Sequence, residues 1–175
     1  MKELKGKAAI VTGATRGIGR AIAEALAEAG IHVTLTSRHA DDCKDAAREI
    51  EQRSGTRALG VACDVRVAAS CASLIEETVK AFGRLDILVN NAGVGGYAPV
   101  AEMDVATWDR IIQTNLNGTF NFCHTIAYSM MRQRKGRIIN ISSVAPDHVN
   151  PGQTNYAASK GAINSFTRAL AVELA

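Results

Sequence analysis

The sequence predicts an α/β fold, a doubly wound parallel sheet with helices on both faces. Two observations support this prediction. Short, apolar, β-branched runs alternate five times with longer segments of helical periodicity, as expected for consecutive βαβ units. A glycine-rich turn follows the first run directly and opens into a helix. With 175 residues, 47% of them hydrophobic and 21% charged, the chain can bury one sizeable core, and we expect residues 1–175 to form a single domain.

The apolar runs are predicted to be strands. They are rich in valine, isoleucine and leucine and are bounded by glycine or by polar turn residues. Most of their residues are apolar rather than alternating with polar ones, which is typical of a parallel sheet buried on both faces. The predicted strands are residues 8–12, 32–36, 57–63, 85–90 and 137–141.

The segments between the strands are predicted to be helices. The first covers residues 17–29, places Ile18, Ile22 and Leu26 on one face, and ends at Gly30, a residue suited to a helix C-terminus. The remaining predicted helices are residues 41–53, 68–82, 104–134 and 155–174. Ligands of such folds bind beyond the carboxyl ends of the strands, so functional residues are expected in the turns that follow them.

Composition excludes several classes of partner and site. The net charge of +3 comes from lysines and arginines scattered among acidic residues, so we expect no nucleic-acid partner. The four cysteines lack Cys-x-x-Cys spacing and the histidines lack ligand spacing, so we expect reduced core thiols and no metal site. The apolar segment near the N-terminus is too short for a signal or a membrane span, which predicts a soluble cytoplasmic protein.

The turn after the first strand has the chemistry of a pyrophosphate site. It reads Thr12-Gly-Ala-Thr-Arg-Gly-Ile-Gly19. Glycines allow a tight turn and close backbone approach, while the free N–H groups and dipole of the following helix attract phosphate. The turn lacks the Gly-Lys-Ser/Thr ending of nucleotide-hydrolysing loops, which disfavours phosphate hydrolysis. The alternative is a turn with a structural role alone.

Two arginines favour NADP over NAD. The second strand ends in Thr36-Ser-Arg38, without the acidic residue that would hold the ribose of NAD. Arg38, together with Arg16 of the glycine turn, can pair with the 2′-phosphate of NADP. The alternative is that both are solvated surface arginines.

Two further strands end in candidate cofactor residues. Asp64, followed by Val65, can accept a hydrogen bond from an adenine amino group, although on sequence grounds a role as the cap of the next helix is the better interpretation. The fourth strand ends in Asn90-Asn-Ala-Gly93, where small and amide side chains allow a flat ligand to approach the backbone; such turns are also common punctuation.

The strongest group of candidate residues follows the fifth strand. Ser142 and Ser143 come directly after it, and Tyr156 and Lys160 lie one turn apart near the start of the last helix. A nearby ammonium group stabilises a phenolate and makes the tyrosine a better proton donor. Ser143 can hydrogen-bond a substrate oxygen as charge develops on it. The alternative is an exposed tyrosine beside a solvated lysine.

Together, and in this order, these motifs resemble the classical short-chain dehydrogenase/reductases. The resemblance implies a Rossmann-like fold that binds NADP(H), with Ser143, Tyr156 and Lys160 as catalytic residues. It also implies that Asn115, within Asn-Leu-Asn-Gly, supports a water-linked proton relay to Lys160. The expected cofactor-binding residues are Gly13, Thr15, Arg16, Gly17, Ile18, Gly19, Arg38, Asp64, Val65, Asn91, Ala92, Gly93, Tyr156 and Lys160.

Within this family, residues 136–143 and 153–160 look most like those of 3-oxoacyl-acyl-carrier-protein reductases. That resemblance implies NADPH-dependent reduction of a β-ketoacyl thioester in fatty acid or polyketide synthesis, with Arg134 docking the acidic carrier protein. The alternative for Arg134 is a favourable interaction with the C-terminal dipole of its own helix. The alternative substrate is a free small-molecule ketone or alcohol.

The resemblance also bears on assembly and on the end of the sequence. Family members are usually tetramers, so we expect a homotetramer. They continue beyond the Tyr/Lys helix with two further strands and a substrate-covering segment, so we expect the fold to be truncated after that helix. A catalytically inactive cofactor-binding fragment is therefore a further alternative.

Overall fold

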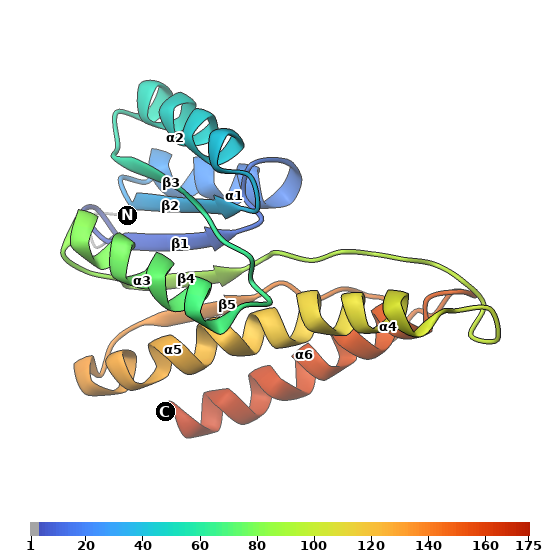
Figure 1. The fold of residues 1–175 in the computed structure, drawn as a ribbon. Helices are drawn as coiled ribbons and strands as arrows, with labels where there is room; N and C mark the ends of the chain where they lie inside the picture. The colour runs from blue at the N-terminus through green and yellow to red at the C-terminus, as the bar shows by residue number, and fades with distance from the viewer. Residues whose placement is uncertain (1–3) are drawn as a thin grey trace.

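The structure, a computed structural model, describes residues 4–175 and contains one parallel sheet of five strands. The strand order is β3-β2-β1-β4-β5 (Figure 1). The strands are β1 (Ala8–Thr12), β2 (His32–Ser37), β3 (Ala58–Ala62), β4 (Ile87–Asn90) and β5 (Arg137–Asn140). All neighbouring strands pair in parallel, with Val11 aligned to Leu35 on one side and to Val89 on the other. The predicted doubly wound sheet is therefore confirmed.

The helices connect these strands in the predicted order. They are α1 (Gly17–Glu28), α2 (Ala40–Ser54), α3 (Ala68–Phe82), α4 (Val105–Ile112), α5 (Gly118–Gln133) and α6 (Thr154–Glu173). Glycines in the left-handed conformation end α2 at Gly55 and α3 at Gly83, where the φ angles are 67° and 76°. Within residues 4–175, no helix has the length and apolar character needed to cross a membrane.

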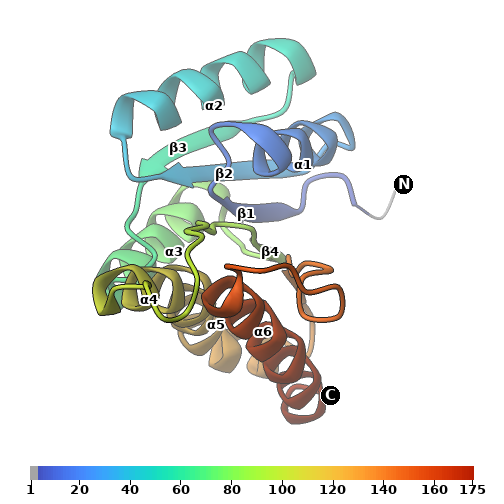
Figure 2. The same ribbon diagram turned by 90° about the vertical axis from the view of Figure 1, so that its right-hand side faces the viewer.

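Two apolar layers cover the sheet, one on each face. Ala9 and Val11 of β1 face a core shared with α1 and α2, whereas Ile10 faces a core shared with α3 and α5. This alternation follows from the two-residue period of a strand. Phe166 and Leu170 of α6 pack at the margin of the second core, and Figure 2 shows α5 and α6 together on that side of the sheet.

The predicted helix over residues 104–134 is wrong as a single regular helix. It is divided by a π-helical segment, η1 (Gln113–Asn117), between α4 and α5. Asp104 caps the first part, since its carboxylate accepts a hydrogen bond from the backbone N–H of Thr107. Asn115 lies in this π-helical segment and is fully buried. Such turns interrupt helices most often at functional sites.

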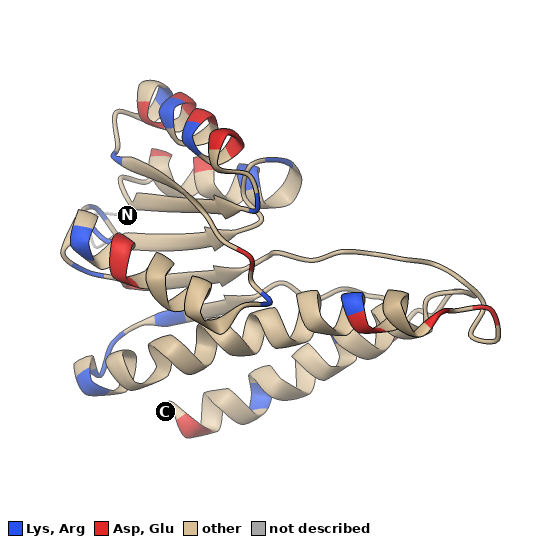
Figure 3. Cartoon of the chain, in the orientation of Figure 1, with Lys and Arg blue, Asp and Glu red and all other residues tan. Residues whose placement is uncertain are grey.

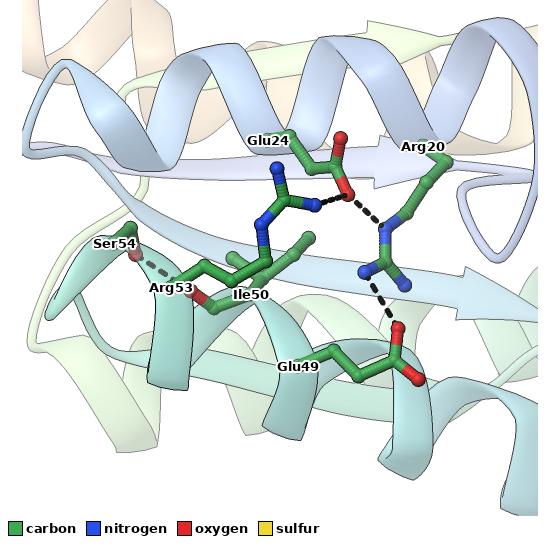
Figure 4. A network of polar contacts seen from close by, with 6 residues as sticks. All are labelled: Arg20, Glu24, Glu49, Ile50, Arg53 and Ser54. Atoms are coloured by element: carbon green, nitrogen blue, oxygen red, sulfur yellow. Dashed lines mark hydrogen bonds and ion pairs between the residues drawn. The ribbon is translucent and has the colours of Figure 1, made fainter.

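Helices α1 and α2 are joined by an ion-pair network (Figure 4). One carboxylate oxygen of Glu24 accepts hydrogen bonds from Arg20 at 2.8 Å and from Arg53 at 3.1 Å. Arg20 also reaches Glu49 at 2.9 Å, so its guanidinium bridges the two helices. Networks of this kind contribute more than isolated surface pairs, because Arg20 and Glu24 are each positioned by two partners.

We expect Glu24→Gln to lower the free energy of unfolding by about 1 kcal/mol, because it removes the shared acceptor of two arginines. The effect should shrink in high salt, which screens exposed charges. Urea denaturation at low and high salt measures both. Asp45→Asn is the matched control, since Asp45 pairs only with the exposed Arg48 on its own helix. Equal effects of the two substitutions would contradict a stabilising role for the network.

Candidate functional site

Two glycines of the turn between β1 and α1, Gly13 and Gly19, lie where a side chain would not fit. Gly13 has a φ of 63°, and a Cβ atom there would approach the Cα of Ala92 to 2.9 Å. A Cβ on Gly19 would lie 2.4 Å from both the carbonyl oxygen of Gly13 and the side-chain nitrogen of Asn91. The backbone of the turn is therefore packed directly against the turn that follows β4.

Thr12 and Asn91 hold these two turns together. The hydroxyl of Thr12 accepts hydrogen bonds from the backbone N–H groups of Asn91 and Ala92, each at 2.9 Å. In return, the amide of Asn91 donates to the carbonyls of Thr12 at 2.8 Å and Gly13 at 3.1 Å. Thr12 was not among the predicted site residues. Its position directly before the glycines was the only sequence signal for it.

The N-terminus of α1 offers free donors at this turn. Arg16 is its N-cap residue but makes no side-chain capping bond, and the first turn contains no acidic residue. The positive end of the helix dipole is thus not neutralised from within the helix. This arrangement fits a bound pyrophosphate, for which the close-packed glycines leave the backbone accessible.

The ends of β1 and β2 are basic. Arg16 and Arg38 follow neighbouring parallel strands, so both lie at the carboxyl end of the sheet, and both are exposed. Figure 3 shows lysine and arginine at this end, while α2 carries both basic and acidic residues. Strand β2 ends in Ser37, so it lacks a carboxylate at the point where an acidic residue would bind the ribose of NAD. This end of the sheet therefore offers two exposed guanidinium groups that can pair with an anion.

Asp64 does not cap α3, which corrects the preferred interpretation from the sequence. The N-cap of that helix is Val67, and no side chain caps it. Instead, the carboxylate of Asp64 is bound by Arg66, whose Nε lies 2.9 Å from Oδ1. The hydrogen bonds from the Arg66 guanidinium hold the pKa of Asp64 below its ordinary value. An adenine amino group at Asp64 would have to share this carboxylate with Arg66.

Asn115 connects three segments of the site. Its side-chain oxygen accepts from the N–H of Val94 at 2.8 Å, and its nitrogen donates to the Val94 carbonyl at 3.1 Å and to the Ser159 hydroxyl at 3.0 Å. Ser159 in turn donates to the carbonyl of Tyr156 at 2.8 Å. The π-helical turn thus ties the segment after β4 to the start of α6. Ser159 was missed from the sequence, although it lies between Tyr156 and Lys160.

Lys160 is buried beneath Tyr156. Only 4% of Lys160 is exposed, and its Nζ donates to the carbonyl of Ile141 at 2.7 Å. The same nitrogen lies 5.9 Å from the centre of the Tyr156 ring. Burial lowers the pKa of the Lys160 ammonium. The alternative of a solvated lysine is therefore wrong.

Gly93, Ser142 and Ser143 complete the candidate site near Lys160. A Cβ on Gly93 would lie 3.4 Å from Oδ1 of Asn115 and 3.6 Å from Nζ of Lys160, so this glycine brings together both predicted residues. The hydroxyl of Ser142 donates to the carbonyl of Lys160, which fixes α6 against the end of β5. The hydroxyl of Ser143 accepts from the N–H of Ala145 and remains half-buried.

The sequence of the chain is similar to those of known dehydrogenases and reductases. A family model described as short chain dehydrogenase matches residues 7–175. The short-chain reductase protein NovJ of Streptomyces niveus is 45% identical over 166 residues, covering 95% of this chain and 63% of NovJ. The 3-oxoacyl-[acyl-carrier-protein] reductase FabG of Aquifex aeolicus is 42% identical over 173 residues, covering 99% of this chain and 70% of the relative.

Solved structures of dehydrogenases are similar to this chain as well. A putative short-chain alcohol dehydrogenase from Sinorhizobium meliloti superimposes with a TM-score of 0.92 at 42% identity, covering 97% of this chain and 67% of the other. NAD⁺-bound xylitol dehydrogenase gives a TM-score of 0.93 at 32% identity, covering 98% and 66%. The chain spans 63% to 70% of the length of these relatives. On its sequence and its structure, the chain belongs to the short-chain dehydrogenase family.

Proposed function

We propose that the chain supplies the cofactor-binding and catalytic part of an NADPH-dependent reductase that converts a 3-oxoacyl thioester to the 3-hydroxyacyl form. The observation that carries this proposal is the buried ammonium of Lys160, 5.9 Å from the ring of Tyr156 and beside Gly93 and Asn115. An ammonium group held there would stabilise negative charge that develops on nearby oxygen atoms during proton transfer. The similarity to the FabG reductases supports the choice of substrate.

The residues of the chain would act as follows. NADPH would supply a hydride to the carbonyl carbon of the substrate. Tyr156 donates its phenolic proton to the carbonyl oxygen, and Ser143 hydrogen-bonds that oxygen as negative charge develops. Lys160 stabilises the resulting phenolate and, with Asn115, returns a proton to Tyr156 through water. We also propose that Lys160 holds the nicotinamide ribose while Asn91, Ala92 and Gly93 line the cofactor.

The remaining cofactor contacts follow from the turns at the strand ends. We propose that Gly13, Thr15, Gly17, Ile18 and Gly19 surround the pyrophosphate. Asp64 and Val65 flank the adenine, and Arg16 and Arg38 bind the 2′-phosphate of NADP. The basic ends of β1 and β2 support this choice over NAD, although the xylitol dehydrogenase of similar structure is NAD⁺-bound.

The test of the proposed function is oxidation of NADPH in the presence of an acetoacetyl thioester, with NADH as the comparison. Turnover that prefers NADPH supports the proposal. Turnover of free small ketones alone would support the second candidate, a small-molecule dehydrogenase, which the similarity to the Sinorhizobium protein favours. Binding of NADPH without turnover of either substrate class would support an inactive cofactor-binding fragment.

Arg38→Asp is expected to reverse the cofactor preference. Loss of a charge-assisted contact to the 2′-phosphate, together with the added repulsion, should lower kcat/KM for NADPH by about 100-fold while changing the value for NADH far less. Steady-state kinetics with both cofactors measures this. Arg48→Asp is the matched control, since Arg48 is an exposed arginine of α2 that, among residues 4–175, forms an ion pair only with Asp45. A parallel loss with both cofactors would refute a phosphate contact at Arg38.

Arg134 supports the proposed docking of an acidic carrier protein. It follows α5 in the left-handed conformation, with φ of 49°, and is exposed beside the basic residues Lys135 and Arg137. Non-glycine residues in this conformation carry a cost in stability, so a structural purpose alone would favour glycine. The exposed guanidinium is therefore better explained by an interaction with a partner.

Arg134→Glu should raise KM for a carrier-protein-bound substrate by about tenfold and leave KM for a small thioester unchanged, because only the former meets the charge. Arg134→Gly should also raise the first KM, while increasing the free energy of unfolding by about 1 kcal/mol through relief of the positive φ. Enzyme kinetics and thermal unfolding measure the two effects. Unchanged KM values for the carrier-bound substrate in both variants would rule out docking at Arg134.

Association of copies of the chain is proposed for the face formed by α4 and α5. Helix α5 has one charged residue, near its C-terminal end (Figure 3), and the two helices carry several exposed apolar side chains, namely Trp108, Phe120, Tyr128 and Met131. Exposed apolar side chains that form a continuous patch mark interaction surfaces, whereas single exposed apolar residues are common on any protein. We propose a homotetramer on this basis and on the family resemblance. We also propose, on the family resemblance, that the enzyme is cytoplasmic.

A further inference from the structure

A segment without regular secondary structure runs beside the start of α6. It covers residues 94–98, directly after Gly93, in the connection between β4 and α4 (Figure 1). Its residues are alternately half-buried and exposed, which is typical of an extended chain. In such a chain every second residue directs its backbone groups to the same side. Among residues 4–175 no strand pairs with this segment, so other groups must satisfy its backbone.

Two buried side-chain amides bind half-buried residues of this segment. Asn115 bonds both backbone groups of Val94, with contacts of 2.8 and 3.1 Å. Asn155 donates from its Nδ2 to the carbonyl of Gly96 at 2.9 Å. Both asparagines are 0% exposed. The two amides therefore take the place of a neighbouring strand, and removal of either would leave buried polar groups unsatisfied.

Asn155 also contacts the proposed proton donor. It is the second residue of α6, directly before Tyr156, and its Oδ1 accepts a hydrogen bond from the backbone N–H of Tyr156 at 2.7 Å. That N–H lies in the first turn of the helix, where backbone donors have no partner within the helix. One amide thus joins Gly96 to Tyr156, with its nitrogen on the first and its oxygen on the second.

The backbone of Tyr156 is bound from both sides by groups that also reach this segment. Its N–H is held by Asn155. Its carbonyl accepts from the hydroxyl of Ser159, which in turn accepts from the amide of Asn115. The position of Tyr156 relative to residues 94–98 thus depends on two separate contacts, of which the one through Asn155 is the more direct.

We propose that Asn155 is a positioning residue of the reaction: its buried amide fixes Tyr156 against residues 94–98 so that the phenolic hydroxyl meets the substrate carbonyl. This role rests on the proposed function, in which Tyr156 is the proton donor. A Cβ on Gly93, directly before the segment, would lie 3.6 Å from Nζ of Lys160, so the segment starts beside the proposed reacting groups. A proton donor must be within hydrogen-bond reach of its acceptor, and a displacement of about 1 Å can lower a rate by about 100-fold.

The first experiment compares Asn155→Ala and Asn155→Asp with the wild-type chain in reduction of an acetoacetyl thioester. The alanine variant removes both contacts, whereas the aspartate variant keeps the side-chain shape and the oxygen that binds Tyr156 but loses the donor to Gly96. We expect kcat to fall by about 100-fold and by at least about tenfold, respectively, and the dissociation constant of NADPH to change by less than about twofold. A kcat within about threefold of the wild type in both variants, or an equal loss of NADPH affinity, would overturn the proposal.

Isotope effects separate a displaced proton donor from a smaller folded fraction. If Asn155 positions Tyr156, its loss makes proton transfer the slow step, and the solvent deuterium isotope effect on kcat should be larger in Asn155→Ala than in the wild type. Partial unfolding lowers kcat without changing the isotope effect, because the remaining folded molecules react as before. Thr56→Val is the matched control: it removes a side-chain bond to a backbone carbonyl, that of Ala27 at 2.9 Å, at the opposite end of the sheet, and should change neither quantity. A lower kcat in Asn155→Ala with an unchanged isotope effect would assign Asn155 a structural role alone.

Hydrogen exchange of the ligand-free protein tests the same contact without any turnover. The N–H of Ala98 donates to the carbonyl of Gly152 at 3.1 Å, two residues beyond the contact between Asn155 and Gly96. We expect peptides that contain residues 94–98 to exchange faster in Asn155→Ala than in the wild type, and equal exchange would overturn the proposal. If the wild-type chain reduced no ketone, the proposed function would be refuted, while the exchange rates would still show whether Asn155 holds the segment.

Discussion

Replacing Tyr156 with phenylalanine is expected to lower kcat for reduction of an acetoacetyl thioester by about 10³-fold. The substitution removes the only atom that would deliver a proton to the carbonyl oxygen, and a positioned general acid accounts for acceleration of this order. The phenyl ring retains the packing over the Lys160 ammonium, whose nitrogen lies 5.9 Å from the ring centre. The affinity for NADPH should therefore change little. Steady-state kinetics and fluorescence titration provide the two measurements.

The matched control is Tyr128→Phe, which removes a phenolic hydroxyl that is exposed on α5. It should leave both kcat and NADPH affinity unchanged. If Tyr156→Phe retained more than about a tenth of the activity, a different group would have to be the proton donor. A large loss of NADPH affinity in the same variant would instead assign Tyr156 to binding.

Gly19→Ala is expected to weaken NADPH binding by about 100-fold and to lower the free energy of unfolding by about 2 kcal/mol. The added methyl group would lie 2.4 Å from the carbonyl oxygen of Gly13, which is too close for two non-bonded atoms, so the backbone of the turn must move. Overpacking a close backbone contact costs stability of this order, and displacement of the donors at the helix N-terminus removes the phosphate site. Titration with NADPH and urea unfolding measure the two effects.

Gly83→Ala separates steric overlap from general loss of stability. Gly83 ends α3 with φ of 76°, and a Cβ there would meet no atom within 4 Å. That variant should be destabilised by about 1 kcal/mol through backbone strain alone and should bind NADPH normally. If both variants lost stability equally and neither lost affinity, the glycine turn would not be the phosphate site.

The sequence predicted the fold well because the fold depends on local patterns. Apolar β-branched runs, helical periodicity and glycines at helix ends are visible without knowledge of tertiary contacts, and the strands and helices begin and end within a few residues of the predicted positions. The interruption at η1 was not predictable in this way. Its wide turn is compatible with the same helical periodicity, and the Asn115 contacts that occupy it involve Val94 and Ser159, which are distant in sequence.

The sequence names the candidate site residues, which stay predictions, but it does not predict the contacts that the structure gives them. The burial of Lys160 and the hydrogen bonds of Thr12 depend on how strand ends meet in space, whereas Asp64 pairs with Arg66 through a local contact two residues along the chain. A sequence motif identifies which chemical groups are available. It does not show whether a carboxylate is already paired or how deeply an ammonium group is buried.

The hydrogen bonds between Thr12 and Asn91 have a consequence for the rate at which ligands exchange. The turns after β1 and β4, which would flank a dinucleotide, are linked to each other by backbone and side-chain hydrogen bonds of 2.8 to 3.1 Å. Arrival of a ligand therefore requires little ordering of this region, and its departure requires no loosening of it. Any slow step in cofactor exchange must then arise from segments outside these two turns.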